Sequence, residues 1–211
     1  MYNYKTIYEP NLSDIVLNTQ TVSKEYAEKV FSFFKNEVLF RWSDAFNDCE
    51  DRANAICILL EEWKIPNYKS WVFAGAFLRR QEGSLVNFWN YHVAAALPVL
   101  ENGELVFYVV DPATSQTLEH IAVWAEKVTD SASSYYLIKD SNYYIFPTSK
   151  MFRDNWNKQN KQNYKWTVQG LAGINGVSKR GQAALVFNKQ RIENTEQKFK
   201  RLMNNKPKDL E

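Results

Sequence analysis

Two segments of the N-terminal half carry hydrophobic residues at helical spacing. The first begins near Ser23, which suits a helix cap, and Glu25 and Glu28 suit the positive end of a helix dipole. The second covers residues 49–63, ahead of Pro66, which stops a helix. The apolar positions that follow the helical period are Tyr26, Val30, Phe31, Phe33 and Phe34, then Ala53, Ile56, Cys57, Leu60 and Trp63.

The middle of the chain changes to a strand pattern, rich in Val, Tyr, Phe and Trp. Asn102-Gly103 is a dipeptide typical of tight hairpins, so it predicts that two of the strands are antiparallel neighbours. We therefore expect a mixed α+β fold. The expected strands are residues 70–78, 88–100 and 104–110, followed by a short helix at 116–127 and a second hairpin at 135–146.

The composition shifts to Asn, Gln and Lys beyond residue 150. The pattern predicts a solvated surface segment at 155–166, a loop punctuated by glycines at 170–176, and a closing helix at 179–204. The expected organisation is a main domain over residues 1–150 with an N-terminal arm over 1–20, and a polar extension over 151–211 that packs on the same domain.

The balance of basic and acidic residues limits the kinds of partner that we expect the chain to bind. The chain has 211 residues with 26 basic and 24 acidic side chains, and this balance lacks the concentrated positive field that nucleic-acid binding needs. Neither a signal peptide nor a membrane-spanning apolar stretch is visible, so we expect a soluble protein with no membrane partner, either cytoplasmic or delivered without a leader. Its oligomeric state is left open.

The candidate chemistry begins at Cys49. In a helix, Cys49 and Cys57 lie ~12 Å apart, too far for a disulfide. A thiol at a helix start feels the positive end of the dipole, which favours the thiolate. The neighbouring acids Asp48, Glu50 and Asp51 oppose this, so a nearby imidazolium would be required. The alternative is that Cys49 is a small buried hydrophobe.

His92 and Asp111 provide the partners that such a thiol needs. His92 starts one expected strand and Asp111 ends the next, ten residues before and nine after the turn centred near residue 102. A hairpin through that turn brings the two almost opposite each other. A nucleophile at a helix start, with base and orienting acid on adjacent strands, is the order of papain-like and transglutaminase-like enzymes. We treat His120 as structural or solvated.

Three motifs resemble the bacterial protein glutaminase family: Asp48-Cys49-Glu50-Asp51-Arg52-Ala53, then Trp89-Asn90-Tyr91-His92-Val93-Ala94, then Val109-Val110-Asp111-Pro112. The resemblance covers about residues 40–150. It implies a papain/transglutaminase-like core, with the nucleophile at a helix N-terminus packed on an antiparallel sheet. It also implies hydrolysis of glutamine side-chain amides to glutamate and ammonia.

The substrate implied by the resemblance is a protein or peptide with an exposed glutamine, and no metal or organic cofactor is expected. Trp42, Asp48, Trp89 and Tyr91 are candidate substrate-binding residues, although aromatic residues near strands more often belong to the core. Polar loops at 79–87 and 114–116 predict an open site in which water outcompetes amines.

Four alternatives stay open at this point. A transglutaminase or a cysteine protease would use the same triad, and the chain could be a toxin or effector delivered to another cell, with a cognate inhibitor or immunity protein. A binding or immunity-type protein would instead hold Cys49 and His92 as structural residues. For Arg52, a salt bridge to Asp48 or Asp51 is favoured over a role in holding the loop next to the site.

Overall fold

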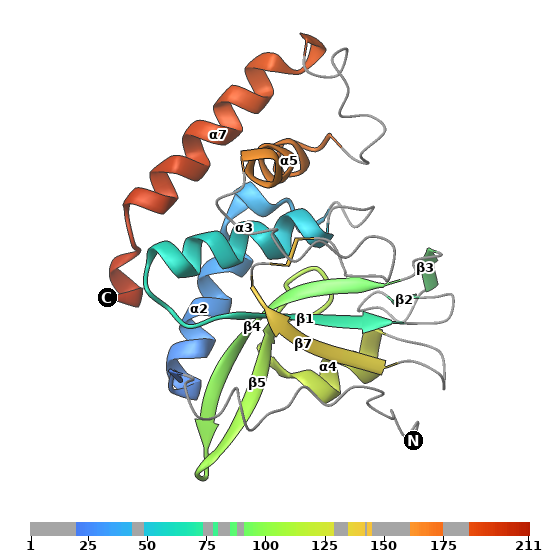
Figure 1. The fold of residues 1–211 in the computed structure, drawn as a ribbon, viewed down its shortest axis with the longest axis vertical. Helices are drawn as coiled ribbons and strands as arrows, with labels where there is room; N and C mark the ends of the chain where they lie inside the picture. The colour runs from blue at the N-terminus through green and yellow to red at the C-terminus, as the bar shows by residue number, and fades with distance from the viewer. Residues whose placement is uncertain are drawn as a thin grey trace.

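The computed structural model describes residues 20–43, 49–73, 78–79, 85–87, 91–128, 135–141, 143–144, 161–174 and 186–211. Within them, an antiparallel sheet has the strand order β6-β5-β4-β1-β7 (Figure 1). Its strands are β1 (Tyr68–Phe73), β4 (His92–Glu101), β5 (Glu104–Val110), β6 (Glu119–His120) and β7 (Tyr135–Asp140), and a separate pair is formed by β2 (Leu78–Arg79) and β3 (Leu85–Asn87).

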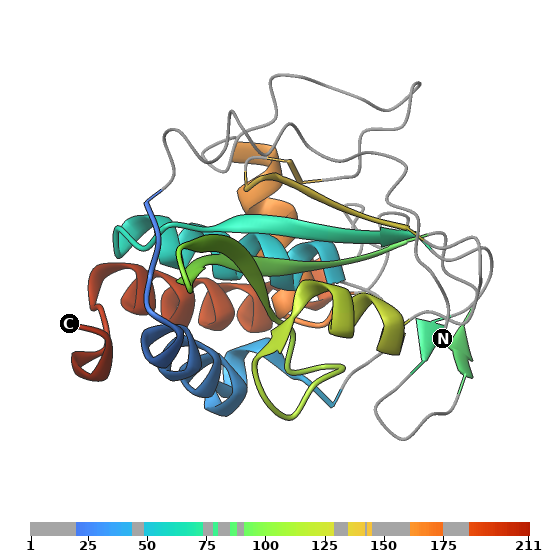
Figure 2. The same ribbon diagram turned by 90° about the horizontal axis from the view of Figure 1, so that it is seen from below.

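Helices cover both faces of this sheet, which confirms the expected α+β fold. In Figure 1, α3 lies between the sheet and helices α5 and α7, and Figure 2 shows the same arrangement from below. The helices are α2 (Lys24–Asn36), α3 (Cys49–Glu62), α4 (Ile121–Val128), α5 (Lys161–Leu171) and α7 (Lys189–Asn204), with short 3-10 turns η1 (Val38–Phe40) and η3 (Lys208–Leu210).

Short sequence motifs determine the start of α2 and the turn between β4 and β5. Ser23 caps α2 as predicted, since its side chain accepts a hydrogen bond from the backbone N–H of Tyr26 at 3.1 Å. The predicted hairpin is also confirmed: Asn102 and Gly103 have φ of 51° and 83°, and Glu101 pairs with Glu104. This turn fixes the register of β4 and β5, and therefore where their far ends meet.

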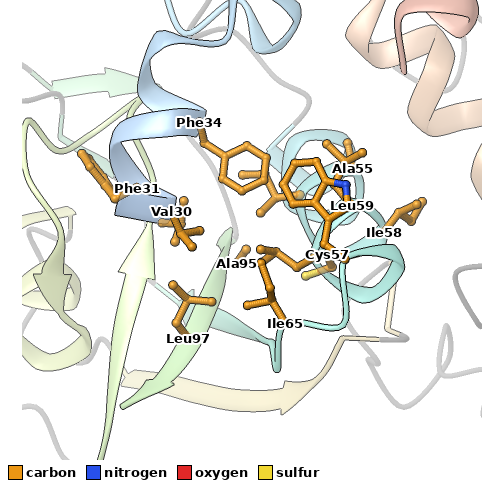
Figure 3. Packing of buried hydrophobic residues seen from close by; sticks show 14 of the residues in the cluster. Val30, Phe31, Phe34, Ala55, Cys57, Ile58, Leu59, Ile65, Ala95 and Leu97 are labelled. Carbon is orange, nitrogen blue, oxygen red and sulfur yellow. The ribbon is translucent and has the colours of Figure 1, made fainter. Parts of the chain in front are cut away.

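The core is divided by the sheet. On one face, alternate residues of β4, such as Ala95 and Leu97, pack against α2 and α3 (Figure 3). On the other face, Ala94 and Ala96 pack against α4. Residues 92–99 of β4 are consequently buried on both faces, which explains a nearly unbroken apolar run in place of strict alternation.

Helix α3 is buried on all sides, whereas the sequence suggested a single apolar face. All ten residues from 51 to 60 are buried, because the sheet covers one side and α5 and α7 pack on the other. The polar members are satisfied by hydrogen bonds: Asn54 donates to Thr167 Oγ1 at 3.0 Å and accepts from buried Lys69 at 2.8 Å. Helix α5 thus completes the surroundings of α3.

Several expectations for the chain beyond α3 differ from the structure. Of the expected solvated segment, residues 155–160 lie outside the described part, whereas residues 161–166 begin α5, in which Asn163 is buried. Of the glycine loop, Gly170 lies inside α5 and against α3, a turn follows at 172–173, and residues 175–176 lie outside the described part. The polar loop at 79–87 includes the paired strands β2 and β3. Of the second hairpin, β7 and a turn at Asp140–Tyr143 are present, but Tyr143 and Tyr144 are not in a strand and residues 145–146 lie outside the described part. The expected helices at 116–127 and 179–204 correspond to α4 and α7.

None of the helices in the described ranges combines the length and apolar character needed to cross a membrane. The polar extension packs on the rest of the chain through α5 and α7, and Trp63 of the main domain donates to the backbone carbonyl of Leu202 at 3.0 Å.

Candidate active site

Cys49 is the first residue of α3, as the sequence predicted. Its half-buried side chain packs beside Tyr91 and Val93, where β4 begins. The thiol donates a hydrogen bond to Glu50 Oε2 at 3.3 Å. The other thiol, Cys57, is fully buried two turns along the helix, and both cysteines are free.

His92 and Asp111 meet as the hairpin geometry predicted. His92 Nε2 lies 2.8 Å from Asp111 Oδ2, and both side chains are buried. The β4–β5 ladder ends at the pair Ala95 and Val110, so the two residues project from strand ends just beyond the last paired position. Their contact is a side-chain bond across the open end of the hairpin.

Asp111 is held by two further donors. Thr114 Oγ1 donates to Oδ2 at 2.5 Å and Trp124 Nε1 donates to the same oxygen at 3.0 Å. Burial alone would raise the pKa of Asp111, but the charge of His92 and these hydrogen bonds outweigh it and hold the pKa below its ordinary value. The carboxylate is therefore ionised at neutral pH and fixed in place.

The Cys49 thiol is not activated in the resting site. Burial, followed by the negative charge of Glu50, raises its pKa well above the ordinary thiol value, although the backbone N–H of Val93 opposes the shift. The opposition of nearby acids to the helix dipole was foreseen from the sequence. The raised pKa of the thiol disfavours a standing thiolate, so nucleophilic chemistry at this sulfur calls for a base that removes the proton during attack.

One pocket joins these groups. Its volume is about 10 Å³, which is about the room that one water molecule takes. A substrate side chain must therefore reach the sulfur from the mouth of this pocket. The lining residues include Trp42, Cys49, Arg52, His92, Val93 and Asp111.

The structure places only two of the four candidate substrate-binding residues near the pocket. Trp42 lines the pocket and also borders an adjacent surface hollow of about 430 Å³. Tyr91 packs beside Cys49 and against Trp71, with ring centroids 5.4 Å apart. Asp48 and Trp89 lie outside the described residues.

Arg52 is buried, and its guanidinium is hydrogen-bonded to backbone carbonyls. Asp48 lies outside the described residues, so the salt bridge favoured from the sequence stays a prediction. The guanidinium of Arg52 donates to the carbonyls of Phe40 and Arg41, each at 2.9 Å, and lies over the ring of Trp42. Arg52 therefore ties the start of α3 to the segment that carries Trp42, which was the other alternative considered.

Two functional neighbours were missed from the sequence, and one loop was misjudged. Thr114 and Trp124 hold Asp111, and the only signal for either was the position of Thr114 three residues after Asp111, where a hydroxyl can reach back in a turn. Thr114 and Ser115 are buried, so of the loop at 114–116 only Gln116 is exposed. His120 is in β6 instead of a surface helix, and its Nδ1 accepts from the N–H of Ala122.

Within the described ranges, no group of three His, Cys, Asp or Glu side chains is arranged to hold a metal ion.

Comparison with known proteins agrees with this arrangement. Residues 27–128, which contain all three of Cys49, His92 and Asp111, match the family model described as glutaminase. No curated protein sequence matches the chain.

Solved structures with a similar fold are protein-glutaminases. The NMR structure of protein-glutaminase from Chryseobacterium proteolyticum is 18% identical with a TM-score of 0.53, and the match covers 75% of this chain and 91% of that one. A crystal structure of protein-glutaminase is also 18% identical (TM-score 0.51; 66% and 84% covered). A crystal structure of pro-protein-glutaminase is 16% identical (TM-score 0.53; 72% and 61% covered). At these identities, the likeness shows a shared fold.

Proposed function

We propose that this chain is a glutaminase, because residues 27–128 match the glutaminase family model, and that Cys49, His92 and Asp111 hydrolyse the side-chain amides of glutamine residues in proteins. The observation that carries the proposal is the shared pocket of the three residues, with His92 Nε2 2.8 Å from Asp111 Oδ2. The reaction releases ammonia and leaves glutamate.

His92 is the base that the thiol lacks. Because Nε2 faces Asp111, Nδ1 is the ring nitrogen that exchanges a proton with Cys49. Asp111 fixes this tautomer and stabilises the imidazolium that forms when the proton is taken. The raised pKa of Cys49 means that proton removal accompanies attack instead of preceding it.

The reaction then follows two steps. Cys49 attacks the carboxamide carbon, and the oxyanion is bound by the backbone N–H of Cys49 at the start of α3. His92 returns its proton to the departing nitrogen as the C–N bond breaks, which gives ammonia and a thioester. Water, deprotonated by His92, then cleaves the thioester to the acid and restores the thiol.

The surroundings of Trp42 support a protein substrate. The hollow of about 430 Å³ next to the pocket is large enough for side chains that flank the target glutamine, and Trp42 is the wall shared by hollow and pocket. Trp42 is fixed there by a hydrogen bond from its indole N–H to the carbonyl of Phe34 at 2.7 Å.

The test compares Cys49→Ala with Cys57→Ala on a glutamine-containing protein. Cys49→Ala should keep the fold and lose activity by about 10³-fold or more. Cys57→Ala should keep activity and lose about 1 kcal/mol of stability, because Cys57 lies in the core. Ammonia release and the conversion of amide to acid, followed by mass spectrometry, measure both. A folded but inactive Cys57→Ala would mean that the nucleophile is misassigned.

A further inference from the structure

We propose that Glu50 is a specificity-determining residue that binds the carboxamide nitrogen of the substrate glutamine and rejects the glutamate product. The proposal rests on the glutaminase function proposed above. It is carried by the position of the Glu50 carboxylate, whose Oε2 is 3.3 Å from the Cys49 sulfur.

The Glu50 carboxylate lies beside the Cys49 thiol, where the substrate carboxamide would react. A carbonyl carbon in position for attack lies about 3–3.5 Å from the sulfur, so the oxygen and nitrogen of the carboxamide lie next to the Glu50 side chain. An ionised carboxylate has only acceptors. It can accept an N–H from the amide nitrogen, and it repels the carbonyl oxygen, which must instead turn toward the backbone N–H of Cys49. Glu50 would thereby select one of two orientations of the amide.

The same charge discriminates product from substrate. After hydrolysis, the NH₂ group is replaced by a carboxylate oxygen, which meets Glu50 as a like charge with no donor between them. Asp51 and Asp111 add to this negative field. Like charges placed together at an interface weaken binding strongly. Glutamate should therefore leave readily and inhibit poorly.

The hydrogen bond from the thiol to Glu50 suggests how substrate frees the nucleophile. In the resting site the S–H donates to Glu50 Oε2. An amide N–H that takes this acceptor leaves the thiol to turn its proton to His92.

Two simpler roles for Glu50 make different predictions. An acid in the first turn of α3 stabilises the helix through its dipole, and that role alone predicts a change in stability without a change in specificity. A purely inhibitory effect on thiol acidity predicts that removing the charge speeds the reaction. The proposed role predicts a more acidic thiol together with a slower reaction and tighter product binding.

The experiment uses the full chain with Glu50→Gln, which keeps the size and an acceptor oxygen but removes the charge. The control is Glu25→Gln, which removes an acid from the first turn of α2, far from the site in sequence and paired with Lys29. Three measurements are made for each variant: kcat/KM on a glutamine peptide, inhibition by the matching glutamate peptide, and the pH profile of Cys49 alkylation by iodoacetamide.

For Glu50→Gln we expect inhibition by the glutamate peptide to strengthen about tenfold or more, and kcat/KM to fall about threefold to tenfold. The alkylation profile should move to lower pH. Glu25→Gln should match the wild type in all three. Unchanged product inhibition, or a kcat/KM that rises as the thiol becomes more acidic, would overturn the proposal.

Binding of the glutamate peptide to Cys49→Ala, with and without Glu50→Gln, gives a second test by calorimetry that needs no turnover. If Glu50→Gln folds poorly, Glu50→Asp replaces it, because the shorter side chain withdraws the carboxylate and should also tighten product binding. A wild type that releases no ammonia from any glutamine peptide refutes the proposed function. If the wild type is active and the Glu50 variants behave like it in these measurements, only this inference is refuted.

Discussion

The indole N–H of Trp124 donates to Asp111 Oδ2 at 3.0 Å, from a helix on the opposite face of the sheet from Cys49. Its ring also lies beside that of His92, with centroids 5.6 Å apart. Trp124 thus contacts both the imidazole and the carboxylate that orients it. The proposed nucleophile and the groups that orient its proposed base are supplied from the two faces of one sheet.

Trp124→Phe should lower kcat about tenfold, because it keeps the ring beside His92 but removes one donor to Asp111. The pKa of Asp111 should rise as that donor is lost. Trp63→Phe is the matched control, since it removes a comparable indole bond, to Leu202, away from the site. Each should cost about 1 kcal/mol of stability. Equal kcat values for the two variants would count against a positioning role for Trp124.

Asp111→Asn should lose at least about 10²-fold in kcat/KM, because asparagine keeps the shape but favours the wrong imidazole tautomer. Asp140→Asn changes an exposed carboxyl at the end of β7 and should leave activity unchanged. Steady-state assays on one glutamine peptide compare the two. If Asp111→Asn retained wild-type activity, another group would have to orient His92.

Asp111 should also contribute to the pH dependence of folding. Its pKa is lowered in the folded state, so its stabilising contribution is present in full above about pH 4 and is lost as the pH falls through the lower folded value. Urea unfolding of wild type and Asp111→Asn between about pH 2 and 6 measures this. The stability difference between the two proteins should change only in the acid part of that range.

Gly170→Ala should destabilise the protein, although the same change in an open helix adds about 1 kcal/mol of stability. A Cβ at Gly170 would lie 2.1 Å from Asp51 Oδ2 and 2.6 Å from Asp51 Cβ, so α5 would have to move away from α3. We expect a loss of about 2 kcal/mol or more. Because Asp51 is two residues from the nucleophile, activity should fall too.

Gly103→Ala is the comparison for this effect. Gly103 has a φ of +83° and nothing within 4 Å of the added Cβ, so its cost comes from the backbone conformation alone, about 1 kcal/mol. Thermal unfolding and ammonia release should show that Gly103→Ala is mildly destabilised and fully active. A Gly170→Ala variant that is more stable than wild type would disprove the close packing of α5 on α3.

Features set by neighbouring residues were predictable from the sequence. The cap at Ser23 and the turn at Asn102-Gly103 depend on groups within a few residues of each other. The meeting of His92 with Asp111 followed from that turn, because a two-residue hairpin fixes the register of both strands to their far ends.

Features set by distant segments were not predictable. The polar residues of α5 indicated a solvated surface, but Thr167 bonds to Asn54 across the interface with α3, which makes a polar helix face suitable for burial. Trp124 was an unremarkable aromatic in its helix, and its bond to Asp111 depends on how α4 packs across the sheet. Neither contact can be inferred from a pattern of residues along the chain.

Water and a primary amine compete for the thioester that the proposed reaction forms on Cys49. The loops once expected to leave the site open do not do so at Thr114 and Ser115, which are buried. The expectation of hydrolysis instead rests on the pocket between Cys49, His92 and Asp111, whose volume of about 10 Å³ suits a water molecule and is too small for a lysine side chain.

We therefore expect acid to be the main product of a glutamine peptide even with millimolar labelled amine present. Mass spectrometry separates the acid from the amine adduct, and a cut backbone would reveal proteolysis. Enlarging the mouth of the pocket with Trp42→Ala should raise the share of adduct, since Trp42 is part of its wall, whereas Trp63→Phe should not. A predominant amine adduct with the wild type would make the chain a transferase that uses the same three residues.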